Sequence, residues 1–219
     1  MSKNITARKV KSMLCFKGFN KDLEATCGNG RMKFEQHKTY IEAESKTVRT
    51  GFHCAEYPMH CLVFYPLGCG NRYFKVEAAG DIDDEERMIA CTQLTIKEEL
   101  TLKELVQYTL LYIMRHPERD MQHSSRRCEV WPESSIQTQD GEGICIAYGK
   151  NPKVKASRGN YIGLIKFMDS GEVVGGMWKV GTMRPEDRDK IVPSNTWLTV
   201  DDIGNLIEDE ELENEREDY

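Results

Sequence analysis

The sequence lacks the features that identify membrane-spanning and secreted proteins. Its 219 residues contain no apolar run approaching the roughly 20 residues that a membrane-spanning helix needs. Residues 1–10 are polar and basic and lack the apolar segment of a signal peptide. We therefore expect a cytoplasmic protein that makes no contact with a membrane.

The common phosphate-binding loops are also missing. Neither G-x-x-x-x-G-K-[ST] nor a G-x-G-x-x-G that follows a predicted strand occurs in the chain. Nucleotide hydrolysis is therefore disfavoured.

Acidic residues are concentrated at the C-terminal end of the chain. Residues 208–219 hold eight acids and one arginine, a net charge of −7, whereas the whole chain carries −6. The remaining residues are nearly neutral, so direct nucleic-acid binding is disfavoured. We predict a disordered tail over 208–219, which could steer a basic partner or simply keep the protein soluble. The binding candidates in this tail are Glu208, Asp209, Glu210 and Glu211.

With 39% hydrophobic residues, the chain can bury a core. Strand-like alternation occurs over 72–82 and 88–96. Thr101 and Glu104 form a capping box that begins a helix with a helical apolar stripe, and Pro117 ends it. The apolar segment 61–65 fits either a helical turn or a strand. These patterns predict an α+β fold with a mixed or antiparallel sheet and one main helix.

The predicted domain organisation has four parts. An α+β domain covers 1–120, and a polar linker or loop covers 121–140. A small β-rich module covers 141–207, in which 161–168 and 173–180 form a hairpin. The acidic tail follows.

Eight cysteines offer two kinds of chemistry. We expect reduced thiols in a cytosolic chain, several of them core residues. His53, Cys54, His60 and Cys61 are the right residue types for zinc, with Cys27 and Cys69 as further candidates, but no zinc-finger spacing occurs. The simpler interpretation is buried thiols and no metal.

A cysteine nucleophile activated by histidine is the second chemistry that we considered. Cys54 follows His53 directly, and neighbours on a strand point to opposite faces, so this pair would need other partners.

The motifs Lys17-Gly-Phe-Asn-Lys-Asp-Leu, Lys38-Thr-Tyr and Gly51-Phe-His-Cys-Ala-Glu-Tyr-Pro resemble an uncharacterised domain of bacterial and bacteriophage proteins. The later segment Pro193-Ser-Asn-Thr-Trp-Leu-Thr-Val is similar to the closing segment of such proteins. About one rung of a β-roll is expected before it, at 144–155. The resemblance implies a phage or bacterial protein in the cytoplasm, the host cytoplasm if it is phage-encoded, and carries no established activity.

A second, looser resemblance is to ADP-ribosyltransferases, which use NAD. In those enzymes an early strand carries Arg or His, aromatic residues surround nicotinamide, and a glutamate stabilises an oxocarbenium-like transition state. The residues that this resemblance would assign to catalysis are Lys17, His53, Tyr65, Glu98 and Glu99. Lys17 departs from the Arg or His of that pattern, and Glu99 could simply be a charge near a helix N-terminus.

The absence of a catalytic motif favours a protein that acts by binding, without a cofactor. We predict that it binds a host protein, as an inhibitor of a host defence factor in one version of this hypothesis. Trp178 and Trp197 are candidate interface anchors, although a core role is the simpler interpretation. Strand edges of the β-rich module would also allow identical chains to associate. An ADP-ribosyltransferase-like enzyme is the alternative.

Overall fold

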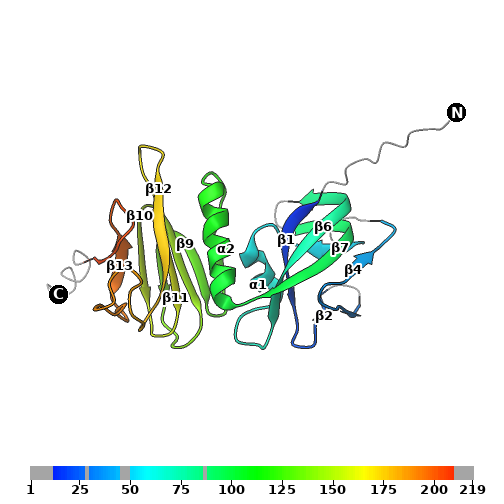
Figure 1. The fold of residues 1–219 in the computed structure, drawn as a ribbon, viewed down its shortest axis with the longest axis horizontal. Helices are drawn as coiled ribbons and strands as arrows, with labels where there is room; N and C mark the ends of the chain where they lie inside the picture. Colours follow the sequence, from blue (N-terminus) through cyan, green and yellow to red (C-terminus); the bar gives the residue numbers. More distant parts are fainter. Residues whose placement is uncertain (1–11, 28–29, 45–49, 86–87, 210–219) are drawn as a thin grey trace. The chain divides into compact units, whose positions relative to one another are not determined.

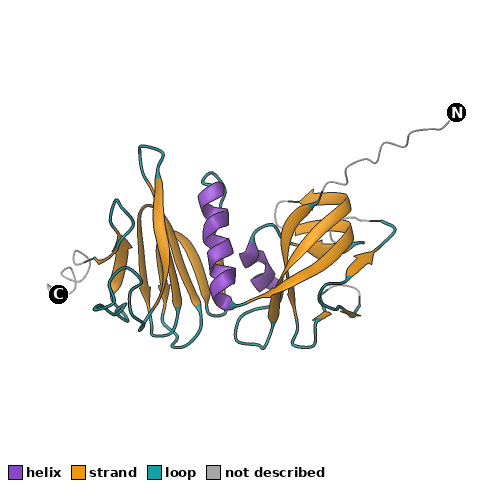
Figure 2. Ribbon diagram, viewed as in Figure 1, coloured by secondary structure: helices purple, strands orange, loops and turns teal. Residues whose placement is uncertain are grey.

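The computed structural model describes residues 12–27, 30–44, 50–85 and 88–209. Within these residues it contains fourteen strands, two α-helices and one 3-10 helix (Figures 1 and 2). The predicted α+β class is therefore wrong: the protein is mostly β. The sequence pattern located one helix well but underestimated how many strands surround it.

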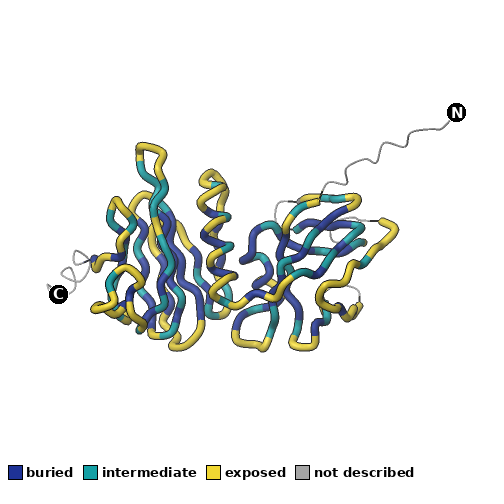
Figure 3. Tube along the Cα trace, in the orientation of Figure 1, coloured by how far each residue is buried: buried dark blue, intermediate teal, exposed yellow. Residues whose placement is uncertain are grey.

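The chain forms two compact units. Unit 1 comprises residues 1–65 and 72–100, and unit 2 comprises residues 66–71 and 101–219. The sequence analysis expected a first domain over 1–120, whereas the structure assigns the helix after residue 100 to unit 2. Figure 3 shows that each unit has its own buried interior.

Unit 1 is built on an antiparallel sheet. Strand β1 (Met13–Phe19) pairs with β6 (Arg72–Glu85), β6 pairs with β7 (Met88–Leu100), and β7 pairs with both β4 (Thr39–Ile41) and β5 (Phe52–Cys54). In the long hairpin of β6 and β7, residues 74–78 and 94–96 alternate buried apolar side chains with partly exposed polar ones, and the pairing shifts register at two points. Short strands β2 (Glu24–Ala25) and β3 (Met32–Lys33) pair separately.

A single β-bridge closes the strands of unit 1 into a ring. Phe16 and Ala55 exchange backbone hydrogen bonds of 2.7 and 2.8 Å, which joins the end of β5 to β1. The interior of this ring is an apolar cluster that includes Cys15, Phe19 and Phe52. The segment after Ala55 forms the 3-10 helix η1 (Pro58–His60) and helix α1 (Cys61–Phe64), so the ambiguous apolar segment is helical.

Helix α2 (Leu102–Arg115) begins at the predicted capping box. Thr101 Oγ1 accepts a hydrogen bond from the Glu104 backbone, and the Glu104 carboxylate accepts one from Thr101 N at 2.8 Å. Within unit 2 its apolar stripe packs on β11 (Tyr161–Phe167), where a Cβ on Gly163 would lie 2.6 Å from Leu110 Cδ2. The glycine thus lets the helix approach the sheet closely.

Unit 2 contains a short β-coil. Strands β9 (Cys128–Gln137), β10 (Ile144–Ala156) and β11 are parallel neighbours, and β10 also pairs with antiparallel β13 (Trp197–Val200). Because β10 pairs in parallel with β9, the chain must return from the end of β9 to a point beside its start. A straight β9 of ten residues would span about 33 Å, and the six residues between the two strands are too few to cover that distance. The chain therefore folds back within β9, at Glu133, whose φ is 60°. The coil begins before the single rung at 144–155 that the resemblance implied.

The remaining strands of unit 2 complete two facing layers around an apolar core that contains Ala147, Val154 and Leu198. They are β8 (His123–Ser125), β12 (Val173–Lys179) and β14 (Leu206–Glu208). Strands β11 and β12 form the predicted hairpin. Residues 121–140, expected as a linker or loop, instead contain strands β8 and β9. Cys128 and Val130 of β9 are buried, although the segment as a whole is polar.

Among the residues that the structure describes, no helix combines the length and apolarity needed to cross a membrane.

Candidate functional site

Unit 1 holds a pocket of about 530 Å³ between residues of β1 and residues of β5. Among the described residues, the Phe16–Ala55 bridge is the only backbone pairing between β1 and the end of β5. Residues of both strands line the pocket beside this bridge. Described residues between positions 25 and 34, together with Cys61 and Phe64 of helix α1, line other parts of the wall. Its size falls within the range of about 300–1,000 Å³ typical of small-molecule sites.

Lys17 occupies an apolar position of β1. Strand alternation places it on the same face as Cys15 and Phe19, both of which have 0% exposure. Its ammonium donates a hydrogen bond to the His53 carbonyl and lies 5.9 Å from the centre of the Phe34 ring. A lysine therefore stands where the strand pattern would place a core residue.

The electrostatic surroundings of Lys17 are unusual for a lysine. Burial lowers its pKa, because removal from water disfavours the charged form, and the weaker influences that oppose this shift come from thiols. These thiols belong to Cys54, Cys61, Cys91 and Cys27. Within the described residues no carboxylate forms an ion pair with Lys17. Among the described residues the ammonium thus has one carbonyl partner and no carboxylate counter-charge.

The buried thiols around the pocket are protonated at neutral pH. Burial raises the pKa of Cys61 to about 12, and a hydrogen bond with Cys15 raises that of Cys54. Since the thiolate is the reactive form, these two cysteines are poor nucleophiles. Among the described residues no three His, Cys, Asp or Glu side chains form a group that could hold a metal ion, the set His53, Cys54, His60 and Cys61 included.

His53 lies between the interior and solvent. It is half-buried, whereas its neighbours Phe52 and Cys54 are buried, as expected for alternation along β5. Burial and the nearby Lys17 charge lower the pKa of its imidazole, so the ring is neutral at pH 7.

Aromatic side chains form much of the pocket wall. The Tyr65 ring lies against the backbone of Gly18, where an added Cβ would come within 2.7 Å of Cδ2. Its hydroxyl accepts a hydrogen bond from Thr26 N at 2.9 Å, and its carbonyl accepts one from Tyr73 Oη at 2.6 Å. These bonds hold the ring in place. The aromatic lining residues are Phe16, Phe34, Phe52, Phe64 and Tyr65.

The more exposed pocket residues are mostly small or polar. Arg31, Gly30 and Cys27 are exposed members of the lining, and His60 is partly exposed. Glu42 is the one carboxylate that lines the pocket in the described part of unit 1. Lys17 and Arg31 therefore outnumber the acids, and the pocket favours an anion.

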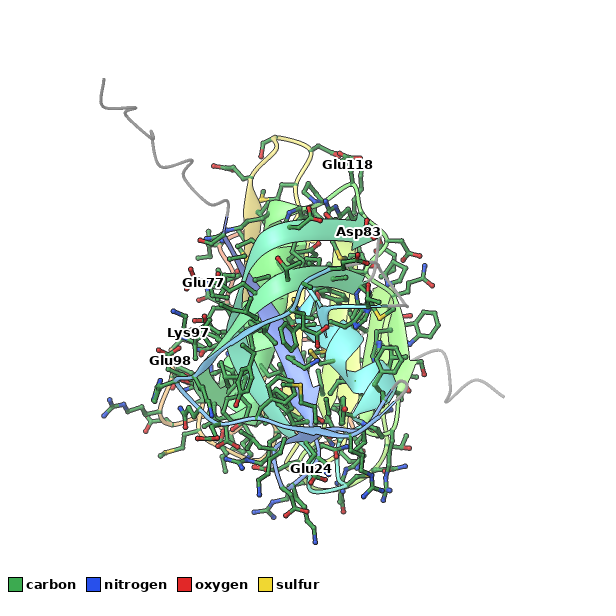
Figure 4. All side chains as sticks on the ribbon, turned by 90° about the vertical axis from the view of Figure 1, so that its right-hand side faces the viewer. Glu24, Glu77, Asp83, Lys97, Glu98 and Glu118 are labelled. Carbon is green, nitrogen blue, oxygen red and sulfur yellow. The ribbon has the colours of Figure 1, made fainter. Side chains whose placement is uncertain are left out.

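The pocket brings together only part of the set considered for ADP-ribosyl transfer. Lys17, His53 and Tyr65 line it, but Glu98 and Glu99 do not. Glu98 pairs with Lys75 at 3.0 Å, and Glu99 accepts two bonds from Arg72 at 2.6 and 2.7 Å. Figure 4 shows Glu98 in a row with Lys97 and Glu77, two residues that also form an ion pair. These partners lower the pKa of both glutamates.

The two tryptophans proposed as interface anchors are in unit 2. Trp178 is 6% exposed and packs in the core, and its indole N–H donates to the Glu186 carboxylate at 3.1 Å. Trp197 is partly exposed on β13. Trp178 is therefore a core residue, which the sequence analysis had named as the simpler interpretation.

The first residues of the predicted acidic tail are attached to the fold. Glu208 ends β14 and pairs with Arg184 at 3.2 Å, and Asp209 pairs with Lys153 at 2.6 Å. Both carboxylates thus have partners within the chain. Glu210 and Glu211 lie outside the described residues.

The sequence analysis missed Arg31, Phe34 and Glu42 as pocket residues and Gly18 as a wall position. Gly18 belongs to the Lys17-Gly-Phe motif, but no motif marks Arg31, Phe34 or Glu42. One signal was available for Lys17: it interrupts the apolar alternation of Met13, Cys15 and Phe19.

Sequence comparison identifies a domain within the chain. Residues 13–108 match a family described as Domain of unknown function (DUF7666), which covers under half of the chain. No curated protein and no solved structure matches the sequence. The matched segment contains every strand of unit 1 and all the described pocket residues. The expected uncharacterised domain is thus confirmed for residues 13–108, and the phage or bacterial setting stays a prediction.

Proposed function

We propose that unit 1 binds a small organic anion with an apolar, ring-containing body. The observation that carries this proposal is the Lys17 ammonium, which lies in the wall of a 530 Å³ pocket without a carboxylate partner among the described residues. The anionic group would lie beside Lys17, and the apolar body would contact the aromatic wall.

The energetics favour such a ligand. An ammonium held away from water costs free energy unless an opposite charge or several hydrogen bonds compensate it. An anion that enters the pocket supplies that charge in surroundings of low polarity, where the attraction is stronger than in water. Apolar surface buried on the rings adds about 25 cal/mol per Å².

Two other functions stay predictions. Binding of a host protein was suggested by the tryptophans and the acidic tail. Trp178, Glu208 and Asp209 have internal roles in the fold, so they do not favour it. The ADP-ribosyltransferase resemblance assigned its glutamate role to Glu98 and Glu99, and both are engaged in ion pairs outside the pocket lining.

Calorimetric titration of the full chain with 3-phenylpropanoate tests the proposal. We expect saturable binding at one site, and no binding of 3-phenylpropanamide, which has the same body without the charge. Lys17→Met should weaken binding by at least about tenfold, or 1.4 kcal/mol.

Lys97→Met is the matched control, because Lys97 lies in the same unit but pairs with Glu77 outside the pocket lining. It should leave the affinity unchanged. Equal binding of the acid and the amide, or an unchanged affinity in Lys17→Met, would contradict the proposal.

A further inference from the structure

We infer that Lys17 is a reactive amine that condenses with a 2-oxo acid in the unit 1 pocket and holds it as an imine. This inference rests on the proposed function and names the class of anion. It assigns covalent chemistry to Lys17, which binding of an anion by charge alone would not require.

The surroundings of the Lys17 amine are those that an imine-forming lysine needs. Its Nζ lies 5.6 Å from the centre of the Phe19 ring and 5.9 Å from that of Phe34, and within the described residues no carboxylate pairs with it. A carboxylate partner would stabilise the protonated form, which has no lone pair to attack a carbonyl. Burial lowers the pKa of Lys17, so its neutral form is populated at lower pH than in an exposed lysine.

With a 2-oxo acid, the Lys17 nitrogen can act first as a cation that attracts the carboxylate and then as a neutral amine that attacks the carbonyl. Its carboxylate attracts the ammonium, and its carbonyl carbon is bonded directly to that carboxylate. The ion pair therefore places the carbonyl within reach of the same nitrogen once the proton leaves. The imine is protonated in turn, so positive charge stays beside the carboxylate after the reaction.

The reaction balances without an oxidant or a cofactor. The lone pair of Nζ forms a bond to the carbonyl carbon, and the C=O π electrons move to the oxygen. One proton passes from nitrogen to that oxygen, through water, to give a carbinolamine. The hydroxyl then takes a second proton and leaves as water, and the nitrogen lone pair forms the C=N bond of the protonated imine.

The pocket wall favours an aromatic oxo acid. Phe34, Phe52 and Tyr65 all line the pocket, and the buried thiols of Cys54 and Cys61 are protonated and do not compete for the carbonyl. Phenylpyruvate is therefore the probe of choice. Phenyllactate has the same ring and carboxylate but a hydroxyl in place of the carbonyl, so it can bind and cannot condense.

The experiment is trapping with borohydride on the full chain. Phenylpyruvate is added, borohydride reduces any imine to a secondary amine, and peptide mass spectrometry locates the label. We expect one adduct, at Lys17, with the mass of the oxo acid minus one oxygen atom. Labelling should be lost in Lys17→Met and in Lys17→Arg, and kept in Lys97→Met.

The Lys17→Arg variant separates charge from reactivity, since a guanidinium keeps the positive charge but does not form the imine. It should still bind phenyllactate in calorimetry. Binding of both acids without an adduct at Lys17, or labelling spread evenly over surface lysines, would overturn the inference and leave the proposed function standing. Failure of both acids to bind would overturn the two together.

Discussion

Arg184 in unit 2 is a buried cation and Lys17 in unit 1 is a partly buried one, but among the described residues only Arg184 has a carboxylate partner. Arg184 is 7% exposed, and its guanidinium donates to the Leu206 carbonyl at 2.9 Å and to the Glu208 carboxylate at 3.2 Å. Lys17 donates to the carbonyl of His53 and pairs with no carboxylate among the described residues.

The difference between the two cations follows from where each one lies. Arg184 joins the turn after β12 to β14, so its bonds hold the end of the described chain to the coil. Lys17 lies in a pocket wall and joins no two elements except through one carbonyl. The fold supplies the partners of Arg184, and we propose that a ligand supplies the anionic partner of Lys17.

Arg184→Met should give the largest effect. It leaves the Leu206 carbonyl without its donor and breaks the Glu208 pair, which in a fully buried case costs about 3–5 kcal/mol. Because Glu208 is 52% exposed, we expect a loss of about 3 kcal/mol in the free energy of unfolding of unit 2. Urea unfolding followed by tryptophan fluorescence measures it, since all three tryptophans are in unit 2.

Glu208→Gln is the control for that measurement. It keeps the shape of the side chain and a hydrogen-bond acceptor, so it should cost well under 1 kcal/mol. A loss as large as that of Arg184→Met would mean that the charge pair, and not the buried carbonyl, dominates.

Gly18→Ala should give the next largest effect and acts on unit 1. The new Cβ would lie 2.7–2.9 Å from the Tyr65 side chain, and such overpacking costs about 2 kcal/mol. Urea unfolding followed by alkylation of Cys91, a buried thiol of unit 1, reports the loss. Gly30→Ala is the matched control, because its Cβ would meet nothing within 4 Å although Gly30 also lines the pocket. Equal stability of the two variants would show that the Tyr65 ring moves freely.

Lys17→Met should have a smaller effect of opposite sign. Removing an uncompensated charge from apolar surroundings should raise the free energy of unfolding of unit 1 by about 1 kcal/mol at pH 7. The pKa of Lys17 is lowered by folding from its ordinary 10.5, so the unfolded chain binds more protons between the two values. Wild-type stability therefore recovers as pH rises, and the advantage of Lys17→Met should shrink towards pH 10.5.

The same alkylation of Cys91 at several pH values measures this difference. Comparing wild type with Lys17→Met at each pH cancels the titration of Cys91 in the unfolded chain, the state in which this buried thiol reacts. A variant less stable than wild type at pH 7 would mean that the hydrogen bond to His53 outweighs the cost of burial.

Local patterns predicted the elements that local forces determine. The capping box of Thr101 and Glu104 gave the start of α2, and the alternation over 161–180 gave the β11–β12 hairpin. The fold class was wrong because the coil depends on contacts between residues 16 to 19 positions apart, such as Cys128 with Ile144 and Gln137 with Ala156. The polar segment 121–140 gave no periodic signal for its strands.

Part of the pocket lining could also be predicted from the sequence. Lys17, His53 and Tyr65 were singled out by a resemblance, and all three line the same pocket. Glu98 and Glu99 were placed with them because they follow a strand, yet both are exposed on β7 and pair with cations on β6, where the strand pairing shifts register between Phe74 and Val76. Only the register between β6 and β7 decides this, and the sequence does not state the register.

Thiol labelling gives the smallest effect and compares the units without any substitution. All eight cysteines are free, and Cys27 in unit 1 and Cys69 in unit 2 are the exposed ones. Both should react with iodoacetamide in the folded protein, whereas the other six should react only after unfolding. Saturating 3-phenylpropanoate should slow Cys27 several-fold, because it lines the pocket, and leave Cys69 unchanged. Equal slowing of both thiols would place the ligand elsewhere, and no slowing of Cys27 would mean that the occupant does not reach this side of the pocket wall.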